Sequence, residues 1–173
     1  MSDPFVPDAP AQNKADEFVL AETYYGKTKP VSLHALRHRV SIYAIIVEDE
    51  KILLLKTHNH RYYFPGGGVD VGENLMDALA REAREELNAE IETGALLHAD
   101  DMIYYHDPVQ RAVHLVRLYY ACRLVTRDLT QHNADERDEI LSIEWIPLHA
   151  LNEQEFLPST WRALQALISG RAK

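Results

Sequence analysis

The sequence predicts an α/β fold with a mixed β-sheet, built as one domain. Strand-like apolar segments lie on both sides of an amphipathic helical segment at 74–88, and a second helical pattern ends the chain. Strands and helices that follow one another in this way pack in layers, with helices covering the faces of a sheet. At 173 residues the chain is long enough for one well-packed core, and no repeat or linker marks a second domain.

The first 30 residues are expected to lie outside this domain, which we place at 31–173. Residues 1–15 are rich in Pro, Asp and Ala without periodicity, which is typical of a mobile tail. The run EFVLAETYY at 17–25 has strand character. It could join the sheet or contact the second subunit of a homodimer, and the sequence leaves both open.

Two strands are predicted before the first helix. Apolar and polar residues alternate over 39–47, and after the turn EDE the segment 51–56 contains the continuous apolar run ILLL, which predicts burial on both faces. Farther along, Tyr62 and Phe64 should face one way from an extended segment and Tyr63 the other. One set of aromatic side chains can then pack while the other lines a cleft.

Three strands and a helix are predicted after the first helix. Residues 98–105 and 111–125 form two strands joined across the turn signal Asp107-Pro108, and 139–146 form a third strand. The last helix begins near residue 159, and its apolar residues recur at helical spacing: Trp161, Leu164, Leu167 and Ile168.

Composition and charge exclude several kinds of protein. With 27 acidic and 18 basic side chains the formal charge is −9, which argues against a basic surface for nucleic acid. The single cysteine, Cys122, excludes an intrachain disulfide and a multi-cysteine zinc site, and its place in a strand predicts a buried thiol. No apolar run approaches a membrane span, and the polar N-terminus does not resemble a signal peptide. We therefore expect a cytoplasmic protein.

The first helix should have defined ends and one apolar face. Asn74 is a suitable N-cap, with Asp77 three residues later as in a capping box. Asn88 can end the helix because Asn tolerates the left-handed conformation of a C-terminal cap. The predicted apolar stripe consists of Met76, Leu79, Ala80, Ala83 and Leu87.

Three carboxylates crowd another face of this helix. Glu82, Glu85 and Glu86 lie within about one turn of the C-terminal end, where they repel one another and where the helix dipole disfavours anions. Arg81 and Arg84 offset only part of this cost. A cluster that breaks two helix preferences indicates an external cation, most naturally a hard divalent ion such as Mg²⁺. The alternative on helix geometry alone is a solvated acidic face.

The spacing across this region resembles the Nudix box, G-x5-E-x7-R-E-U-x-E-E-x-G-U, in which U is aliphatic. Six fixed positions match at full spacing: Gly67, Glu73, Arg81, Glu82, Glu85 and Glu86. Ala83 and Ala89 fill the U positions, and Asn88 stands where the family has Gly. The resemblance covers roughly residues 36–170. It implies an α/β/α sandwich that hydrolyses a phosphoanhydride bond in a nucleoside diphosphate linked to another group, using Mg²⁺ or Mn²⁺.

The resemblance also implies roles for individual residues. Glu82, Glu85 and Glu86 would bind metal together with the carbonyl of Gly67, while Arg81 and Glu73 would pair and hold the ligand carboxylates in place. The general base would be a box glutamate, Glu86 or Glu85, or an acidic residue before the last strand. The candidates there are Asp135, Glu136, Asp138 and the best placed of them, Glu139. Candidate substrate contacts are Arg39, for a phosphate, and the aromatic residues Tyr63 and Tyr105.

Substrate identity is the least determined feature. The simplest expectation is a nucleoside triphosphate cleaved to monophosphate and pyrophosphate; a dinucleoside polyphosphate or a nucleotide sugar is the alternative. Tyr105 lies in the region where dinucleoside polyphosphate hydrolases of the family carry a tyrosine, and no well-placed proline favours ADP-ribose. A non-catalytic nucleotide-sensing module is the alternative from another class, motivated by Asn88 and by the N-terminal segment.

Overall fold

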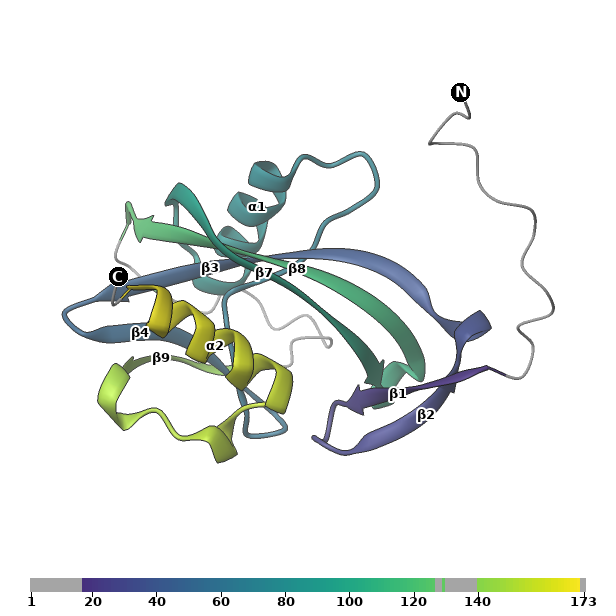
Figure 1. The fold of residues 1–173 in the computed structure, drawn as a ribbon. Coiled ribbons are helices and arrows are strands. Elements are labelled where there is room, and N and C mark those ends of the chain that lie inside the picture. The colour runs from purple at the N-terminus through teal and green to yellow at the C-terminus, as the bar shows by residue number, and fades with distance from the viewer. Residues whose placement is uncertain (1–16, 127–128, 130–139, 172–173) are drawn as a thin grey trace, which may run out of the picture.

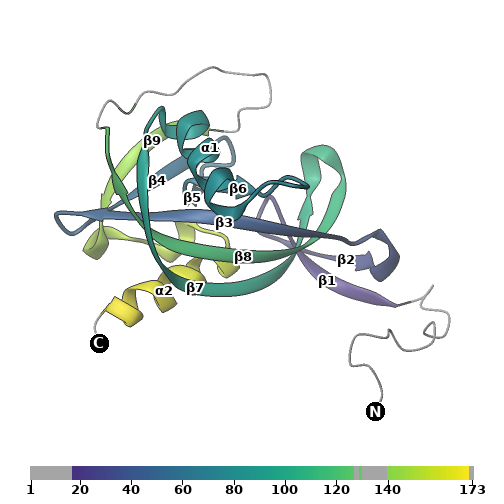
Figure 2. The same cartoon turned by 90° about the horizontal axis from the view of Figure 1, so that it is seen from above.

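A curled mixed sheet lies between two helices in the computed structural model, which describes residues 17–126, 129 and 140–171 (Figure 1). Helix α1 (Leu75–Leu87) packs on one face and helix α2 (Pro158–Arg171) on the other, as the view from above also shows (Figure 2). The predicted α/β/α sandwich is therefore confirmed.

The sheet contains both parallel and antiparallel strand pairs, so it is mixed as predicted. Their order is β2-β1-β7-β8-β3-β4-β5, with β6 on β3 and β9 on β4. The β1–β7 and β3–β8 pairs are parallel, and the other pairs are antiparallel. The strands are β1 (Phe18–Thr23), β2 (Thr28–Ser32), β3 (Arg37–Glu48), β4 (Lys51–Thr57), β5 (Tyr62–Tyr63), β6 (Gly66–Gly68), β7 (Ile91–His106), β8 (Arg111–Leu124) and β9 (Ile140–Pro147).

Strand β4 shows how the two layers of core are built. Leu53 and Leu55 pack into the cluster under α1, whereas Ile52 and Leu54 pack into the cluster under α2. All four side chains are buried, because alternate residues of a strand point to opposite faces and both faces are covered. The burial on both faces predicted from the run ILLL is confirmed.

The N-terminal segment joins the sheet. β1 pairs with β7 through Glu22 and Thr23, which lie opposite Tyr104 and Tyr105, and it forms a hairpin with β2. Strand β2 was not expected, and the predicted boundary at residue 30 falls inside it. Pro30 fits there because β2 is an edge strand with one unpaired side. Residues 1–15 lie outside the described part, and contact with a second subunit stays a prediction.

Strand β7 is longer than expected and begins directly after α1. Its pairing with β8 shifts register between Thr93 and Leu96 and again between Leu96 and His98. The segment before His98 contains Gly94 and lacks regular alternation, which hid it from a pattern-based prediction. In the described part of the chain, neither helix is long and apolar enough to cross a membrane.

Cys122 packs against the core cluster under α1. Burial raises the pKa of its thiol to about 11. A thiol that stays protonated at neutral pH is a poor nucleophile, so its role is structural.

Candidate active site

Helix α1 carries most of the candidate site, and its two ends are formed differently. Asn74 has the extended backbone of an N-cap, but its side chain caps no backbone N–H and instead donates to Asp77 Oδ2 at 3.1 Å. The capping-box hydrogen bonds are therefore absent between these two residues, although the helix begins where predicted. At the other end Asn88 is left-handed (φ 52°, ψ 39°), and its N–H donates to the carbonyl of Arg84 at 3.1 Å. Asn88 thus supplies the C-cap conformation as predicted.

The buried face of α1 differs from the predicted stripe in its first turns. Ala78, Leu79, Ala83 and Leu87 are buried, whereas Met76 is 40% exposed. Leu75 contacts the core in the first turn, and the i+3 and i+4 positions from it are Ala78 and Leu79. Met76 lies one residue off that series, which turns it away from the sheet.

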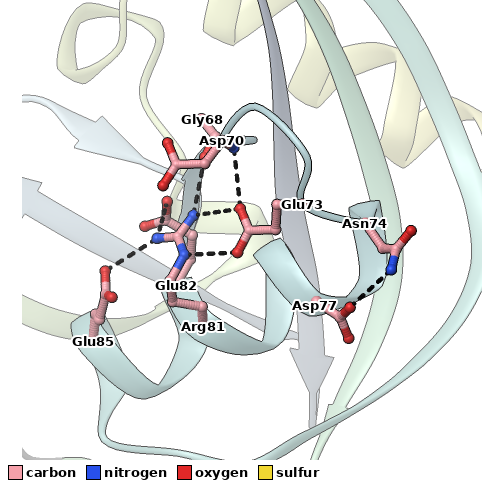
Figure 3. A network of polar contacts seen from close by, with 8 residues as sticks. All are labelled: Gly68, Asp70, Glu73, Asn74, Asp77, Arg81, Glu82 and Glu85. Atoms are coloured by element: carbon pink, nitrogen blue, oxygen red, sulfur yellow. Dashed lines mark hydrogen bonds and ion pairs between the residues drawn. The ribbon is translucent and has the colours of Figure 1, made fainter.

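Arg81 organises the polar face of α1 (Figure 3). Its Nε and Nη2 donate to Glu73 Oε1 at 2.9 Å and Glu73 Oε2 at 3.1 Å, and Nη2 also reaches the carbonyl of Gly68 at 3.1 Å. Its Nη1 donates to Glu82 Oε1 at 2.9 Å and to Glu85 Oε2 at 3.2 Å. A two-point contact with Glu73 fixes the guanidinium, and the guanidinium in turn orients two box glutamates.

The electrostatics follow from these contacts. The hydrogen bonds from Arg81, and then the Asp70 N–H, lower the pKa of Glu73, and the same pairing raises the pKa of Arg81. Burial raises the pKa of Glu82, with the nearby Arg81 opposing that effect. Glu82 is therefore a partly buried carboxylate whose charge is disfavoured by burial and supported by the adjacent Arg81 guanidinium.

The glycine loop approaches the glutamates closely through backbone atoms. Gly66, at φ 128°, donates its N–H to Glu86 Oε2 at 2.7 Å. A Cβ at Gly67 would lie 2.6 Å from Glu82 Oε1, and a Cβ at Gly68 would lie 1.8 Å from Arg39 Nη2. The absence of side chains here lets a carboxylate and a guanidinium lie directly against the strand.

The oxygen-rich composition of this site fits a hard divalent cation. Glu82 and Glu85 already face one positive group, the Arg81 guanidinium, and Gly67 leaves its backbone accessible beside Glu82. Within the described residues, however, no three His, Cys, Asp or Glu side chains are gathered closely enough to hold an ion together. The hydrogen bonds explain this arrangement. Arg81 donates to Glu82 and Glu85, while Glu86 accepts from the N–H of Gly66.

A cleft of about 330 Å³ opens beside the glutamates. Glu82, Glu85 and Glu86 line one side, and most of the remainder is aromatic, so we name it the aromatic cleft; its aromatic lining residues are Tyr24, Tyr43, Tyr63, Phe64 and Tyr104. Tyr62 is buried in the α2-side core, whereas Tyr63 lines the cleft and is not part of that core. Phe64 is buried in the same core as Tyr62 and also borders the cleft. The predicted division of that aromatic run is therefore confirmed for Tyr62 and Tyr63, while Phe64 contributes to both sides.

Tyr105 does not join this cleft. Its ring lies under Lys29, whose Nζ is 3.8 Å from the ring centroid, and packs against the small core beneath β1 and β2. Its neighbour Tyr104 lines the cleft instead. Alternation along β7 separates the two, and sequence spacing alone could not tell which of them faces the site. Tyr24 was missed because the contribution of the N-terminal hairpin was not foreseen.

The remaining predicted residues lie as follows. Arg39 is on β3 with its guanidinium beside Gly68, and it is close enough to Glu82 to lower the pKa of that carboxyl. Glu139, like Asp135, Glu136 and Asp138, lies outside the described residues. The structure thus brings together all six matching box positions with Arg39 and Tyr63.

Comparison with known proteins agrees with this geometry. A sequence model of the NUDIX domain matches residues 37–167. Nucleoside triphosphatase NudI of Enterobacter sp. (strain 638) is 29% identical over 136 residues, which is 72% of this chain and 93% of that protein. NudI of Escherichia fergusonii is 28% identical over 140 residues, which is 75% of this chain and 96% of that protein.

Solved structures with a similar fold include a NUDIX hydrolase. A NUDIX hydrolase from Nitrosomonas europaea has a TM-score of 0.63 at 17% identity, covering 78% of this chain and 90% of that one. The E. coli ORF135 protein has a TM-score of 0.57 at 28% identity, covering 81% of this chain and 95% of that one. With the family match spanning most of its length, the chain belongs to the Nudix family and is a Nudix pyrophosphohydrolase.

Proposed function

We propose that this enzyme hydrolyses a phosphoanhydride bond in a nucleoside diphosphate derivative with the help of Mg²⁺ or Mn²⁺, most simply a nucleoside triphosphate to monophosphate and pyrophosphate. One observation carries the proposal. Arg81, held by both oxygens of Glu73, fixes Glu82 and Glu85 at a cleft whose lining includes five aromatic side chains. The similarity to curated nucleoside triphosphatases supports a nucleotide as substrate.

Glu82, Glu85, Glu86 and the carbonyl of Gly67 would hold the cation. When bound, it would neutralise charge on the pyrophosphate and make a water molecule more acidic. Glu85 is the carboxylate freest to turn toward a ligand, since 58% of its side chain is exposed and its pairing with Arg81 is a surface contact. Glu73 and Arg81 would keep Glu82 in position during this change.

Hydrolysis adds one water across the P–O–P bridge. The water oxygen forms a bond to one phosphorus, the bridging oxygen leaves with the other phosphate, and a water proton passes to a carboxylate. Glu86 and Glu85 are the candidate acceptors of that proton among the described residues, and Glu139 remains a third. Arg39 would donate to a phosphate oxygen, because its guanidinium lies against Gly68 at the end of the glycine loop.

The aromatic side chains would hold the nucleobase. Tyr63 and Tyr104 line the cleft from different strands and would supply aromatic surface for a base to stack on. A dinucleoside polyphosphate loses its sequence support, because Tyr105 lies away from the cleft. A non-catalytic sensing module loses its main motivation, since Asn88 ends α1 with the backbone conformation that Gly provides.

The test is a screen of nucleoside triphosphates, dinucleoside polyphosphates and nucleotide sugars with Mg²⁺ and Mn²⁺, monitoring release of phosphate or pyrophosphate. We expect turnover of triphosphates that falls about 100-fold or more in Glu86→Gln, because that carboxylate lies at the reacting centre. Glu90→Gln is the matched control, as it removes a carboxylate that pairs with Arg84 on the surface. No turnover with any substrate, or equal losses in the two variants, would contradict the proposal.

A further inference from the structure

A second hollow, of about 320 Å³, adjoins the aromatic cleft across Tyr43 and Tyr104. Gly67 and Gly68 form part of its wall, so it begins where the glycine loop meets the box glutamates. Its charged lining is Arg39 and Arg111, and we name it the basic hollow. Among its described lining residues none is Asp or Glu, although the whole chain has a formal charge of −9.

The two arginines reach this hollow from neighbouring strands. Arg39 on β3 lies opposite Leu115 on β8, and Arg111 lies four residues before Leu115 on the same strand. At about 3.3 Å per residue this places the two Cα positions roughly 13 Å apart along the strand direction. The hollow therefore extends well past Arg39, away from the box glutamates.

In the described part of the chain, neither arginine forms an ion pair. Both are exposed, and neither forms an ion pair with a described carboxylate, in contrast to Arg81, Arg84, Arg117 and Arg123. Arginine forks bind phosphate at two points and carry a fixed positive charge. An acid-free hollow with two such forks next to a carboxylate cluster has the chemistry of a phosphate subsite.

We propose that the basic hollow binds a phosphate group on the far side of the cleaved bond, and that Arg111 selects substrates that carry one. This inference rests on the proposed hydrolysis and names the substrate class of the same site. The aromatic cleft takes the nucleoside, the bond to be cleaved lies by the glutamates and the glycine loop, and the terminal phosphate enters the basic hollow. A sugar in that place carries no charge for Arg39 and Arg111, so nucleoside triphosphates are preferred over nucleotide sugars.

The experiment compares kcat/KM for a nucleoside triphosphate and a UDP-sugar in variants of Arg111. Arg111→Gln should lower the value for the triphosphate about ten-fold or more, because a charge-assisted contact is lost, while leaving the UDP-sugar within about two-fold. Arg111→Lys should recover part of the loss, since it keeps the charge without the fork. Arg37→Gln is the matched control: it removes an exposed arginine of β3 that shares a neighbouring hollow with Arg111 but does not line the basic hollow, and both substrates should stay within about two-fold.

A double variant tests whether the two arginines act on one group. If Arg39 and Arg111 hold the same phosphate, the loss in Arg39→Gln/Arg111→Gln should differ from the product of the single losses. Calorimetry with a non-hydrolysable triphosphate analogue gives a second readout that needs no turnover, and Arg111→Gln should weaken its binding about ten-fold.

The outcomes separate this inference from the proposed function. Wild-type enzyme that hydrolyses no phosphoanhydride would end the proposed function, and calorimetry would then still decide whether Arg111 binds phosphate. Turnover in which Arg111→Gln equals Arg37→Gln, or loses both substrates equally, would overturn the inference while leaving hydrolysis standing. Stronger effects with a dinucleoside polyphosphate than with a triphosphate would overturn the assignment of the basic hollow to a terminal phosphate.

Discussion

The two helices pack against opposite faces of the same sheet but differ in the side chains that they contribute. Helix α1 buries one face and uses the other to present Arg81 and three glutamates, of which Glu86 accepts a hydrogen bond from the glycine loop while Arg81 donates one to it. Helix α2 contributes mainly apolar residues to the core, among them Ala163, Leu164 and Leu167. The same architecture thus gives one helix the candidate catalytic residues and the other a place in the apolar core of the sheet.

The polar contacts of α2 reinforce this contrast. They lie at its first turn, where the Ser159 N–H donates to Glu22 and its carbonyl accepts from Arg117 at 3.4 Å. Arg117 is itself held at two points by Asp100, at 2.8 and 2.7 Å. These contacts tie α2 to strands β1, β7 and β8. Substitutions of the box glutamates on α1 should therefore change activity, and substitutions on the buried face of α2 should change stability.

The largest expected effect is on activity, in Glu82→Gln. The change keeps the shape of the side chain and one acceptor for Arg81 but removes the charge that the cation and substrate would meet, so kcat/KM should fall about 100-fold or more. The free energy of unfolding should change by no more than about 1 kcal/mol, because burial of the charge already opposes its pairing with Arg81.

Steady-state kinetics and urea denaturation of the same preparation check this pair of outcomes. Asp77→Asn is the control on α1, since Asp77 is exposed and contacts Asn74 rather than the box. If Glu82→Gln lowers both stability and activity, the proposed division between α1 for activity and α2 for stability is contradicted.

The next effect is on stability, in Leu164→Ala. Leu164 is fully buried against Phe156 and the strands, so its truncation leaves a cavity and should lower the free energy of unfolding by about 2–5 kcal/mol. Activity of the folded fraction at low temperature should stay close to wild type. Urea denaturation measures the first quantity, and Gln165→Ala, at an exposed position of α2, is the control. A strong loss of kcat/KM in a variant that remains folded would show that α2 also shapes the site.

Much of the site could be predicted because its chemistry is local in sequence. Glu73 and Arg81 lie eight residues apart, and the helix and the short loop before it are enough to bring them together. The alternation of Tyr62, Tyr63 and Phe64 is likewise a property of a few consecutive residues. In both cases short-range geometry determines which way a side chain points.

What could not be predicted depends on pairing between distant segments. Tyr104 rather than Tyr105 faces the aromatic cleft because of the register in which β7 pairs with β8 and β1. A register shift of one residue would exchange the positions of the two side chains. Tyr24 reaches the cleft because the N-terminal hairpin pairs with β7, about eighty residues later in the chain. Met76 is exposed because α1 makes its first contact with the core through the neighbouring residue, Leu75. Each of these is set by tertiary contacts that no local pattern contains.

The smallest expected effect concerns the C-terminal end of α1, at Asn88. Its left-handed backbone costs an alanine about 1–2 kcal/mol, costs Asn less, and costs Gly essentially nothing. Asn88→Ala should therefore lower the free energy of unfolding by about 1 kcal/mol, and Asn88→Gly should leave it nearly unchanged or raise it slightly.

Urea denaturation of the two variants distinguishes this conformational role from a chemical one. If the cap acts only through the backbone, Gly restores what Ala loses, and the departure from the family's glycine is neutral in function. Equal stability of the Ala and Gly variants would show that the left-handed conformation is not what Asn88 provides. In that case the end of α1, like its exposed face, would belong to the chemistry of the site rather than to the packing that α1 shares with α2.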